Sequence, residues 1–209
     1  MPDQFYIQSY VSLSNGQAQV NGQSLSLPDH NDLLKALYQH LSLDYPKFFK
    51  MDELCKLAFM AAELLLKEES LQNYTENQIA IVLANASSTL ETDRKHQQSI
   101  QNEEAYFPSP AVFVYTLPNI TIGEIAIRHK LKGENTFFIA EQYDIRFMSY
   151  YTNSILNHER AEKVISGWVE WNTNGYEAFL YLAGKEKTGL SLAHTQALVD
   201  QLYTNSKIK

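Results

Sequence analysis

The apolar residues of this 209-residue chain follow two periodicities, one typical of strands and one of helices. From Phe5 to Leu13 they alternate roughly from side to side, which predicts a strand. The turn dipeptides Asn15-Gly16 and Asn21-Gly22 come next, so we expect a hairpin there. Further along the chain, the runs that predict strands are Gln78 to Asn85, Thr136 to Ala140, Lys163 to Trp171 and Gly175 to Ala183.

Between these strands the apolar residues recur at helical spacing. The predicted helices are 32–41, roughly 50–67, 118–133, the stretch that follows Gln142, and a last helix capped by Ser191. The helix after Gln142 has apolar residues around most of its circumference, which indicates a buried position. The polar stretch Arg94 to Glu104 is expected to be a solvated helix or loop, with His96 exposed.

The stretch from Pro108 to Asp144 carries the strongest local signals. Pro118 suits the first turn of a helix, where its missing N–H costs nothing, and Gly133 tolerates the left-handed conformation that ends one. Thr136 to Ala140 lacks polar alternation, which is typical of a strand covered on both faces in an α/β protein. The chain then turns into a helix at Gln142. Several enzyme folds place a nucleophile at such a strand–turn–helix junction.

Several short motifs in this stretch occur together in one order and at nearly fixed spacing. They are Ser109-Pro110, Thr116 to Asn119, Gly123 to Arg128, and Lys132 to Thr136. In this order they resemble the N-terminal half of the β-ketoacyl synthases, the condensing enzymes of fatty-acid and polyketide synthesis. The resemblance implies an α/β fold of the thiolase-like type, a mixed sheet flanked by helices. We expect residues 1–209 to form a single domain of this kind.

The resemblance also implies where the catalytic cysteine of the family would stand. Counting from the turn at Lys132 to Asn135 places that position at Gln142. A condensing synthase needs a Cys thiolate to take up the acyl chain, and an amide cannot become a thiolate. Its two helper groups, His and His or His and Asn, come from the C-terminal half of the family's fold. We expect that half, and therefore the helpers, to be missing from this chain.

Glutamine at this position is itself found in the family. It resembles the chain-length-factor subunits of type II polyketide systems, and also the loading-type synthases that decarboxylate malonyl groups. The former pair with an active synthase and shape the tunnel between the subunits. By that resemblance, the residues at the subunit interface are Tyr115, Thr116, Leu117, Pro118 and Asn119, of which the first three border the partner's acyl tunnel. The alternative is that these residues only pack a helix start.

Composition narrows the range of partners. With 17 Lys and Arg against 24 Asp and Glu, the formal charge is 17 − 24 = −7. That charge argues against a nucleic-acid partner, an anionic membrane surface, and a main docking site for an acidic carrier protein. A single cysteine excludes an intrachain disulfide and indicates a reducing, cytoplasmic location. We expect no signal peptide and no membrane span.

The remaining candidate residues carry weaker signals. Cys55 lies beside Leu54 on a predicted helix, and we expect a small buried hydrophobe rather than a catalytic thiol. Ser88 lacks the Gly-x-Ser-x-Gly context of a nucleophile, so we expect it to cap a helix. His194 on the last helix has no assigned role, and a surface position is one possibility. The six histidines show no paired ligand spacing, and no phosphate-binding glycine motif occurs, so we expect no metal and no cofactor.

Three functions remain open at this stage. The first is a non-catalytic, chain-length-factor-like subunit that pairs with an active condensing enzyme in fatty-acid, polyketide or aryl-polyene type synthesis. The second is a decarboxylase of carrier-bound malonyl groups that uses Gln142, with His129 and His158 replacing the missing helpers. The third is a scaffold protein that kept only the fold. Because half of a two-part fold uncovers apolar surface, we expect a strong partner, either an active synthase or a second copy of this chain.

Overall fold

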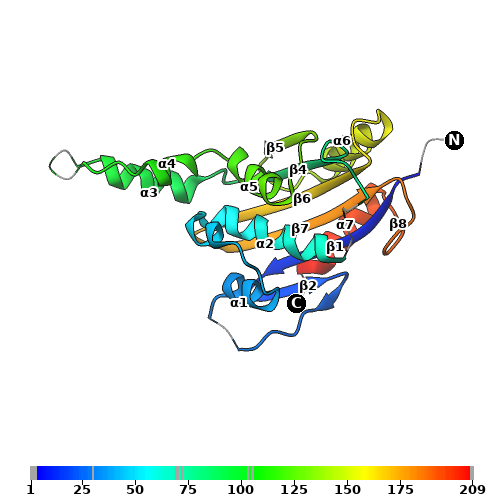
Figure 1. Cartoon of the computed structure of the whole chain (residues 1–209), viewed down its shortest axis with the longest axis horizontal. Helices are drawn as coiled ribbons and strands as arrows, with labels where there is room; N and C mark the ends of the chain where they lie inside the picture. The colour runs from blue at the N-terminus through cyan, green and yellow to red at the C-terminus, as the bar shows by residue number, and fades with distance from the viewer. Residues whose placement is uncertain are drawn as a thin grey trace.

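The computed structural model describes residues 4–29, 31–68, 71, 73–102, 104 and 106–207. Its strands form one mixed sheet of eight strands in the order β3-β2-β1-β7-β6-β4-β5, with β8 paired to β1 (Figure 1). The strand bounds are β1 Tyr6–Ser14, β2 Gln17–Val20, β3 Gln23–Ser24, β4 Ile79–Asn85, β5 Asn135–Ile139, β6 Lys163–Asn172, β7 Gly175–Gly184 and β8 Leu192–Ala193. Strand β4 runs parallel to both β5 and β6, whereas β7 is antiparallel to β6 and to β1.

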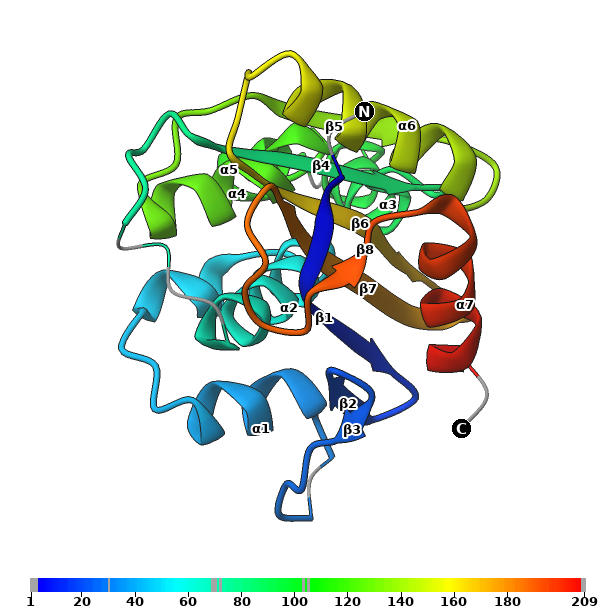
Figure 2. The same cartoon turned by 90° about the vertical axis from the view of Figure 1, so that its right-hand side faces the viewer.

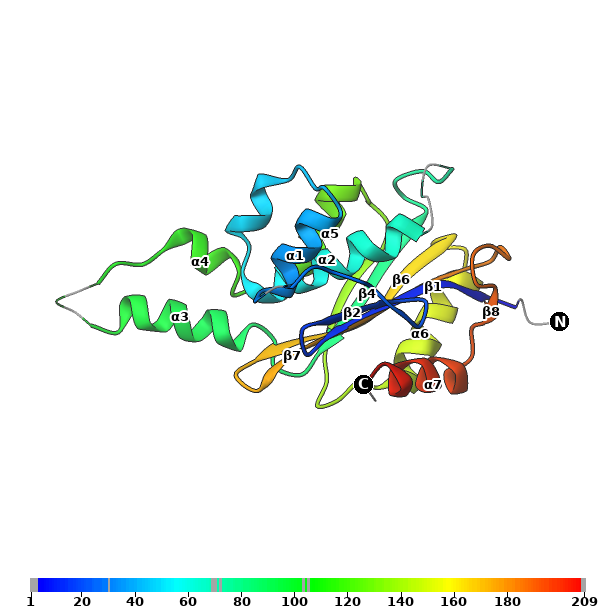
Figure 3. The same cartoon turned by 90° about the horizontal axis from the view of Figure 1, so that it is seen from below.

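Helices cover the sheet on both faces. On one face lie α1, α2 and α5, and on the other lie α6 and α7, as Figures 2 and 3 show. The bounds are α1 Leu33–His40, the 3-10 helix η1 Pro46–Lys50, α2 Glu53–Glu68, α5 Asn119–His129, α6 Ile145–Asn157 and α7 Gln196–Lys207. None of the helices within the described ranges combines the length and the hydropathy that a membrane crossing requires.

The position of β4 between two helical layers explains why polar and apolar residues do not alternate in its sequence. Ile79, Ile81 and Leu83 point into the core beneath α2 and α5, while the intervening side chains point into the core beneath α6. All seven residues of the strand are buried. A strand between two helical layers must be apolar on both sides, which accounts for the continuous run.

Two helices, α3 (Leu90–Ile100) and α4 (Pro110–Val114), form an arm that extends away from the sheet (Figures 1 and 3). The arm is attached at its base by two side-chain hydrogen bonds. Thr92 Oγ1 donates to Asp52 Oδ2 at 2.7 Å, and Thr89 Oγ1 donates to the carbonyl of Thr116 at 2.8 Å. Asp52 also accepts from the backbone N–H of Cys55, so one carboxylate joins the start of α2 to the arm.

The structure corrects three predicted helix ends. Thr89, not Ser88, precedes α3, because Ser88 is in the left-handed region with φ 50°. Helix α5 ends at the left-handed Lys130 rather than at Gly133. Gly133 instead lies where a Cβ would collide with the carbonyl of Ile79.

At the C-terminal helix the expected cap is also wrong. Ser191 lies before β8, and the Thr195 hydroxyl accepts from the N–H of Leu198 at the start of α7.

Two expectations about burial are met only in part. Strand β5, predicted to be covered on both faces, packs Phe137 against one core and Phe138 against the other, but it is the edge strand of the described sheet and leaves Ile139 exposed. Helix α6 was expected to be buried all round, yet Phe147 and Tyr150 on it are exposed. Phe147 nevertheless contacts β5, since its ring centroid lies 4.9 Å from that of Phe138. His96 is half-buried rather than exposed, because its ring packs against Phe113 at 5.3 Å between centroids.

His194 is buried, which its sequence context did not predict. Its Nδ1 lies 2.7 Å from Asn153 Oδ1 on α6, and its Nε2 lies 3.2 Å from the Tyr181 hydroxyl on β7. Burial lowers the pKa of His194 to about 4. The neutral imidazole therefore joins the segment before α7 to the sheet and to α6.

This buried histidine predicts a loss of stability in mild acid. The unfolded imidazole titrates near 6.5 and the folded one near 4. Between these values the unfolded state binds more protons, so the free energy of unfolding falls as the pH drops from about 6.5 to 4, by roughly 3 kcal/mol. Urea unfolding at stepped pH measures this loss. His194→Gln, which can hydrogen-bond without titrating, should be less pH-dependent in that window. If the free energy of unfolding of that variant fell with pH as steeply as that of the unmodified chain, His194 would not be the group responsible.

Candidate functional site

Strands β4, β5 and β6 are parallel, so their carboxyl ends meet at one edge of the sheet. Ligands of α/β proteins commonly bind outside that edge. The loop that follows β5 places Gln142 there, two residues before Asp144, which caps α6 through the N–H of Phe147. The Gln142 side chain is exposed, and its amide makes no hydrogen bond to a described residue. The junction predicted from the sequence therefore exists, with an amide on its surface.

The buried acid at this edge is Glu170, which the sequence analysis missed. Its Oε2 accepts from the backbone N–H groups of Ala86 and Ser87, at 2.7 and 3.2 Å. Its Oε1 accepts from Asn172 at 3.2 Å. A single acidic residue in the mostly apolar strand β6 was the signal that could have revealed it. Because backbone amides occupy the carboxylate, Glu170 fixes the turn after β4 rather than offering a free base.

The residues considered for chemistry are not brought together at Gln142. Cys55 is buried on α2 with its Sγ 3.5 Å from Thr121 Oγ1, and burial together with Asp52 raises the pKa of its thiol. A high pKa disfavours the thiolate that nucleophilic chemistry needs. Cys55 is thus the buried hydrophobe that its position predicted.

The two candidate helper histidines have other partners. His129 Nε2 lies 3.1 Å from Glu63 Oε1, and His158 Nδ1 lies 2.8 Å from the carbonyl of Ser154 within α6. Arg128 also donates to Glu63 at 2.9 Å, and these two bases hold the pKa of the Glu63 carboxyl below its usual range against the effect of burial. Hence His129 belongs to an ion-pair cluster at the end of α5.

The predicted interface residues connect the arm to α5. Tyr115 is buried, and its hydroxyl donates to Glu124 Oε1 at 3.2 Å. Burial and the Glu124 carboxylate raise the pKa of Tyr115. Glu124 is itself only 4% exposed and pairs with Lys47 at 2.7 Å. Tyr115 thus packs the inner side of this connection.

The other four predicted interface residues differ in exposure. Thr116 is half-buried and donates to the carbonyl of Phe113 at 2.7 Å, and Pro118 is the residue before the first turn of α5. Leu117 is 53% exposed, and Asn119 is exposed as well. Tyr115 is therefore enclosed by residues of this chain, while Leu117 and Asn119 are exposed to contact by another molecule.

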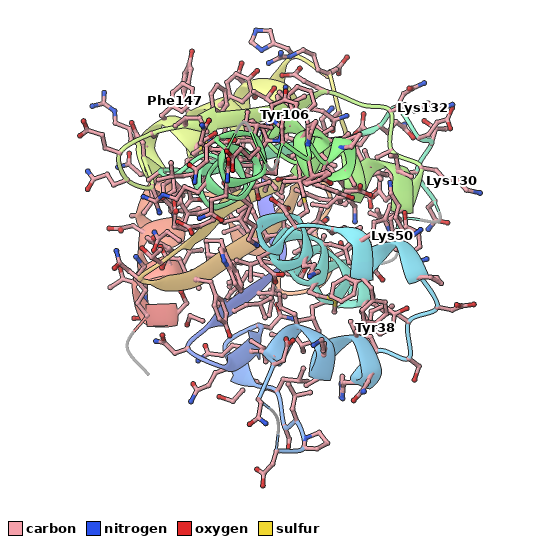
Figure 4. All side chains as sticks on the ribbon, turned by 90° about the vertical axis from the view of Figure 1, so that its left-hand side faces the viewer. Tyr38, Lys50, Tyr106, Lys130, Lys132 and Phe147 are labelled. Carbon is pink, nitrogen blue, oxygen red and sulfur yellow. The ribbon has the colours of Figure 1, made fainter. Side chains whose placement is uncertain are left out.

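Large exposed apolar side chains gather on the arm, on β5 and on α6. They are Leu90, Tyr106, Phe107, Phe113, Val114, Leu117, Ile139, Phe147 and Tyr150, and we call this set the apolar surface. Phe107 is 77% exposed. Figure 4 is viewed from the end of the arm, and both of its labelled members, Tyr106 and Phe147, lie in the upper part of that view. Large apolar side chains exposed in this number are typical of interaction sites.

The hollows of the surface are shallow. One of about 180 Å³ lies at the base of the arm and is lined by Lys50, Met51, Asp52, Glu53, Thr92, Lys95, Ala111, Val112 and Tyr115. A larger one of about 660 Å³ lies over α2 and the end of α5, with His129 and Glu63 on its lining. Gln142 lines neither of them.

The geometry of the site predicts a large loss of stability for one substitution and almost none for another. Glu124→Ala leaves the buried Tyr115 hydroxyl and Lys47 without their partner, so the free energy of unfolding should fall by about 1–3 kcal/mol. Gln142→Ala removes an exposed side chain without a partner, so the change should stay within about 0.5 kcal/mol. Chemical denaturation of both variants measures the difference. A large loss for Gln142→Ala would show that its amide has a structural partner.

Comparison with known proteins gives matches at the level of structure. No protein-family model and no curated protein sequence matches this chain. Among solved structures, the ishigamide ketosynthase/chain length factor aligns with a TM-score of 0.64 and 18% identity, over 90% of this chain and 64% of the other.

Two further complexes are similar. The type II polyketide complex AntDE:AntF aligns with a TM-score of 0.59 and 13% identity, over 90% of this chain and 64% of the other. The ketosynthase ApeO in complex with its chain length factor ApeC from Xenorhabdus doucetiae aligns with a TM-score of 0.57 and 16% identity, over 88% of this chain and 79% of the other. The chain thus spans 64% of the length of the first two matched chains. It has the thiolase-like fold of these ketosynthase structures.

Proposed function

We propose that this chain is a non-catalytic, chain-length-factor-like subunit that binds an active β-ketoacyl synthase. The observation that carries the proposal is the apolar surface on the arm, β5 and α6. A solvated protein rarely keeps so many large apolar side chains exposed together, and burying them against another chain is strongly favourable. Leu117, one of the predicted interface residues, belongs to this surface, and the exposed Asn119 follows it by two positions.

The edge of the sheet supports the same interface. Strand β5 pairs with β4 on one side only, so the backbone N–H and C=O groups of its other side are available to a second chain. An open edge with the exposed Ile139 favours strand addition or close packing by a partner. The arm and the open edge together offer a partner both apolar contacts and backbone hydrogen bonds.

The chemistry around Gln142 supports a role without catalysis. An exposed amide stands at the junction where the resembled family has its cysteine, and the thiol of Cys55 is buried elsewhere. His129 and His158 are engaged with Glu63 and Ser154. The chain would therefore act by shaping its partner, with the exposed Leu117 and the half-buried Thr116 beside the partner's acyl tunnel and the buried Tyr115 supporting them from within.

Three of the similar structures are relevant to the choice of partner and pathway. Two of them contain a ketosynthase and a chain length factor, and the third is an acyl-carrier protein in complex with its ketosynthase. We infer a ketosynthase as the partner of this chain, in fatty-acid, polyketide or aryl-polyene type synthesis. Because this chain carries a formal charge of −7, we infer that an acidic carrier protein meets the complex mainly through that partner.

Co-purification with the intact β-ketoacyl synthase encoded nearest to this chain tests the proposal. We expect a stoichiometric complex whose mass, measured by light scattering, equals the sum of the subunits. A homodimer alone would favour self-association. A chain that remains monomeric beside the synthase would contradict the proposal. Carbon dioxide release from malonyl carrier protein by the purified chain would instead favour the decarboxylase, and Gln142→Ala would identify the residue responsible.

Substitutions on the apolar surface test where the partner binds. Phe107→Ser and Leu117→Ser should each weaken the complex about tenfold or more, because exposed aromatic and aliphatic side chains at interface centres dominate binding energy. Their free energies of unfolding should change by less than about 0.5 kcal/mol. Gln201→Ala, on the exposed polar side of α7, is the matched control. Unchanged affinity in both serine variants would place the interface elsewhere.

Product length tests the tunnel assignment separately. In a reconstituted synthase, Leu117→Trp adds volume next to the predicted tunnel, so the average product should become shorter while the complex still forms. Mass spectrometry of the released products measures the shift. An unchanged product distribution from an intact complex would leave Leu117 as a contact residue that does not border the tunnel.

A further inference from the structure

At seven of the eight glycine positions, the described structure of this chain explains why a side chain is absent. At Gly123 it does not. Five of the seven have a positive φ that side chains rarely adopt, namely Gly16, Gly22, Gly167, Gly175 and Gly189. At Gly133 a Cβ would collide with the carbonyl of Ile79, and at Gly184 it would press on the Gln8 side chain at 3.1 Å. At Gly123 a Cβ would meet no described atom within 4 Å.

Gly123 lies in the middle of α5, where glycine is unfavourable. It weakens a helix relative to alanine because it has more backbone freedom to lose on folding. Since the helix has ordinary right-handed geometry there, alanine would fit without strain in the isolated chain. The absent side chain therefore leaves room on the outer surface of the helix rather than inside the fold.

The inner side of α5 is already occupied. Ile122 and Ile125 are buried in the core beneath α2, and Glu124 is held by Lys47 and Tyr115. At a spacing of four residues, Asn119, Gly123 and Ile127 share the outer side. Ile127 is 61% exposed, an unusual position for a large aliphatic side chain next to a glycine that makes a flat surface.

This outer side continues the proposed interface. Asn119 is one of the residues expected at the subunit boundary, and the exposed Leu117 precedes it by two positions. One turn beyond Ile127 comes Lys130, which is exposed, points away from the body in Figure 4 and makes no ion pair with a described residue. The outer side of α5 thus offers a flat surface at Gly123, one exposed aliphatic side chain at Ile127 and a cation at Lys130.

We propose that a segment of the ketosynthase partner packs its backbone directly against Gly123, with an apolar side chain on Ile127 and a carboxylate near Lys130. This inference rests on the proposed function and extends the interface from the arm along the whole of α5. Glycine is the residue that lets another backbone approach a helix closely, so its helix-weakening effect is tolerated for that contact. Without this contact, the surface of this chain that the partner covers would end at Asn119.

Gly123→Ala separates stability from binding. In the free chain the substitution should raise the melting temperature by about 2–4 °C, because alanine is the better helix former. In the complex the added methyl group should hold the partner away, so the dissociation constant measured by titration calorimetry should rise at least tenfold. Ile127→Ser should weaken binding without any gain in melting temperature. Thr204→Ala, on the exposed side of α7, is the control that improves a helix and should leave binding unchanged.

The outcomes distinguish this inference from the proposed function. Binding of the unmodified chain together with unchanged binding of Gly123→Ala would overturn the inference and leave the proposed function intact. A lower melting temperature for Gly123→Ala would also overturn it, because glycine would then be required inside the fold. Failure of the unmodified chain to bind the synthase would overturn both.

Discussion

Burial of β4 on both faces is the constraint on which the rest of the structure depends. The side chains of this strand alternate between two cores, one beneath α2 and α5 and one beneath α6 and α7. Each helical layer must be present for the strand to be stable, because a strand this apolar cannot leave one face to water. The parallel pairing with β5 and β6 then brings the ends of three strands, and Gln142 after one of them, to a single edge.

The same arrangement determines where large apolar side chains stay exposed. Helix α7 closes the second core with Val199 and Leu202 and presents a polar outer side. Exposed apolar residues instead concentrate on the arm and around β5 and α6, where the sheet has an open edge. An interface at this position would bury the arm and the edge strand together. The proposed extension along α5 would place the helix that packs on the first core in contact with the partner as well.

The candidate site shows how polar residues serve the fold rather than chemistry. Glu170 supports the turn after β4 by accepting two backbone N–H groups, and Glu124 links the arm to η1 through Tyr115 and Lys47. Buried carboxylates with all their partners inside the chain stabilise one conformation of the backbone around Gln142 and the arm. The exposed amide of Gln142 at a rigid edge of the sheet is consistent with the proposed subunit, which would contribute surface shape to its partner rather than a catalytic group.

Local sequence signals determined most of the secondary structure. The asparagine-glycine turns, the apolar strands and the spacing of apolar residues in α1, α2 and α5 depend on neighbours along the chain, and the motifs around Gly123 to Thr136 were enough to indicate the fold. Helix ends were less predictable, since Lys130 and Ser88 adopt left-handed conformations that glycine and asparagine more often occupy. Only the tertiary structure decided which side chains are covered. The edge position of β5, the exposure of Phe147, the burial of His194 and the empty space beside Gly123 all depend on residues distant in sequence, and no local pattern records where those residues pack.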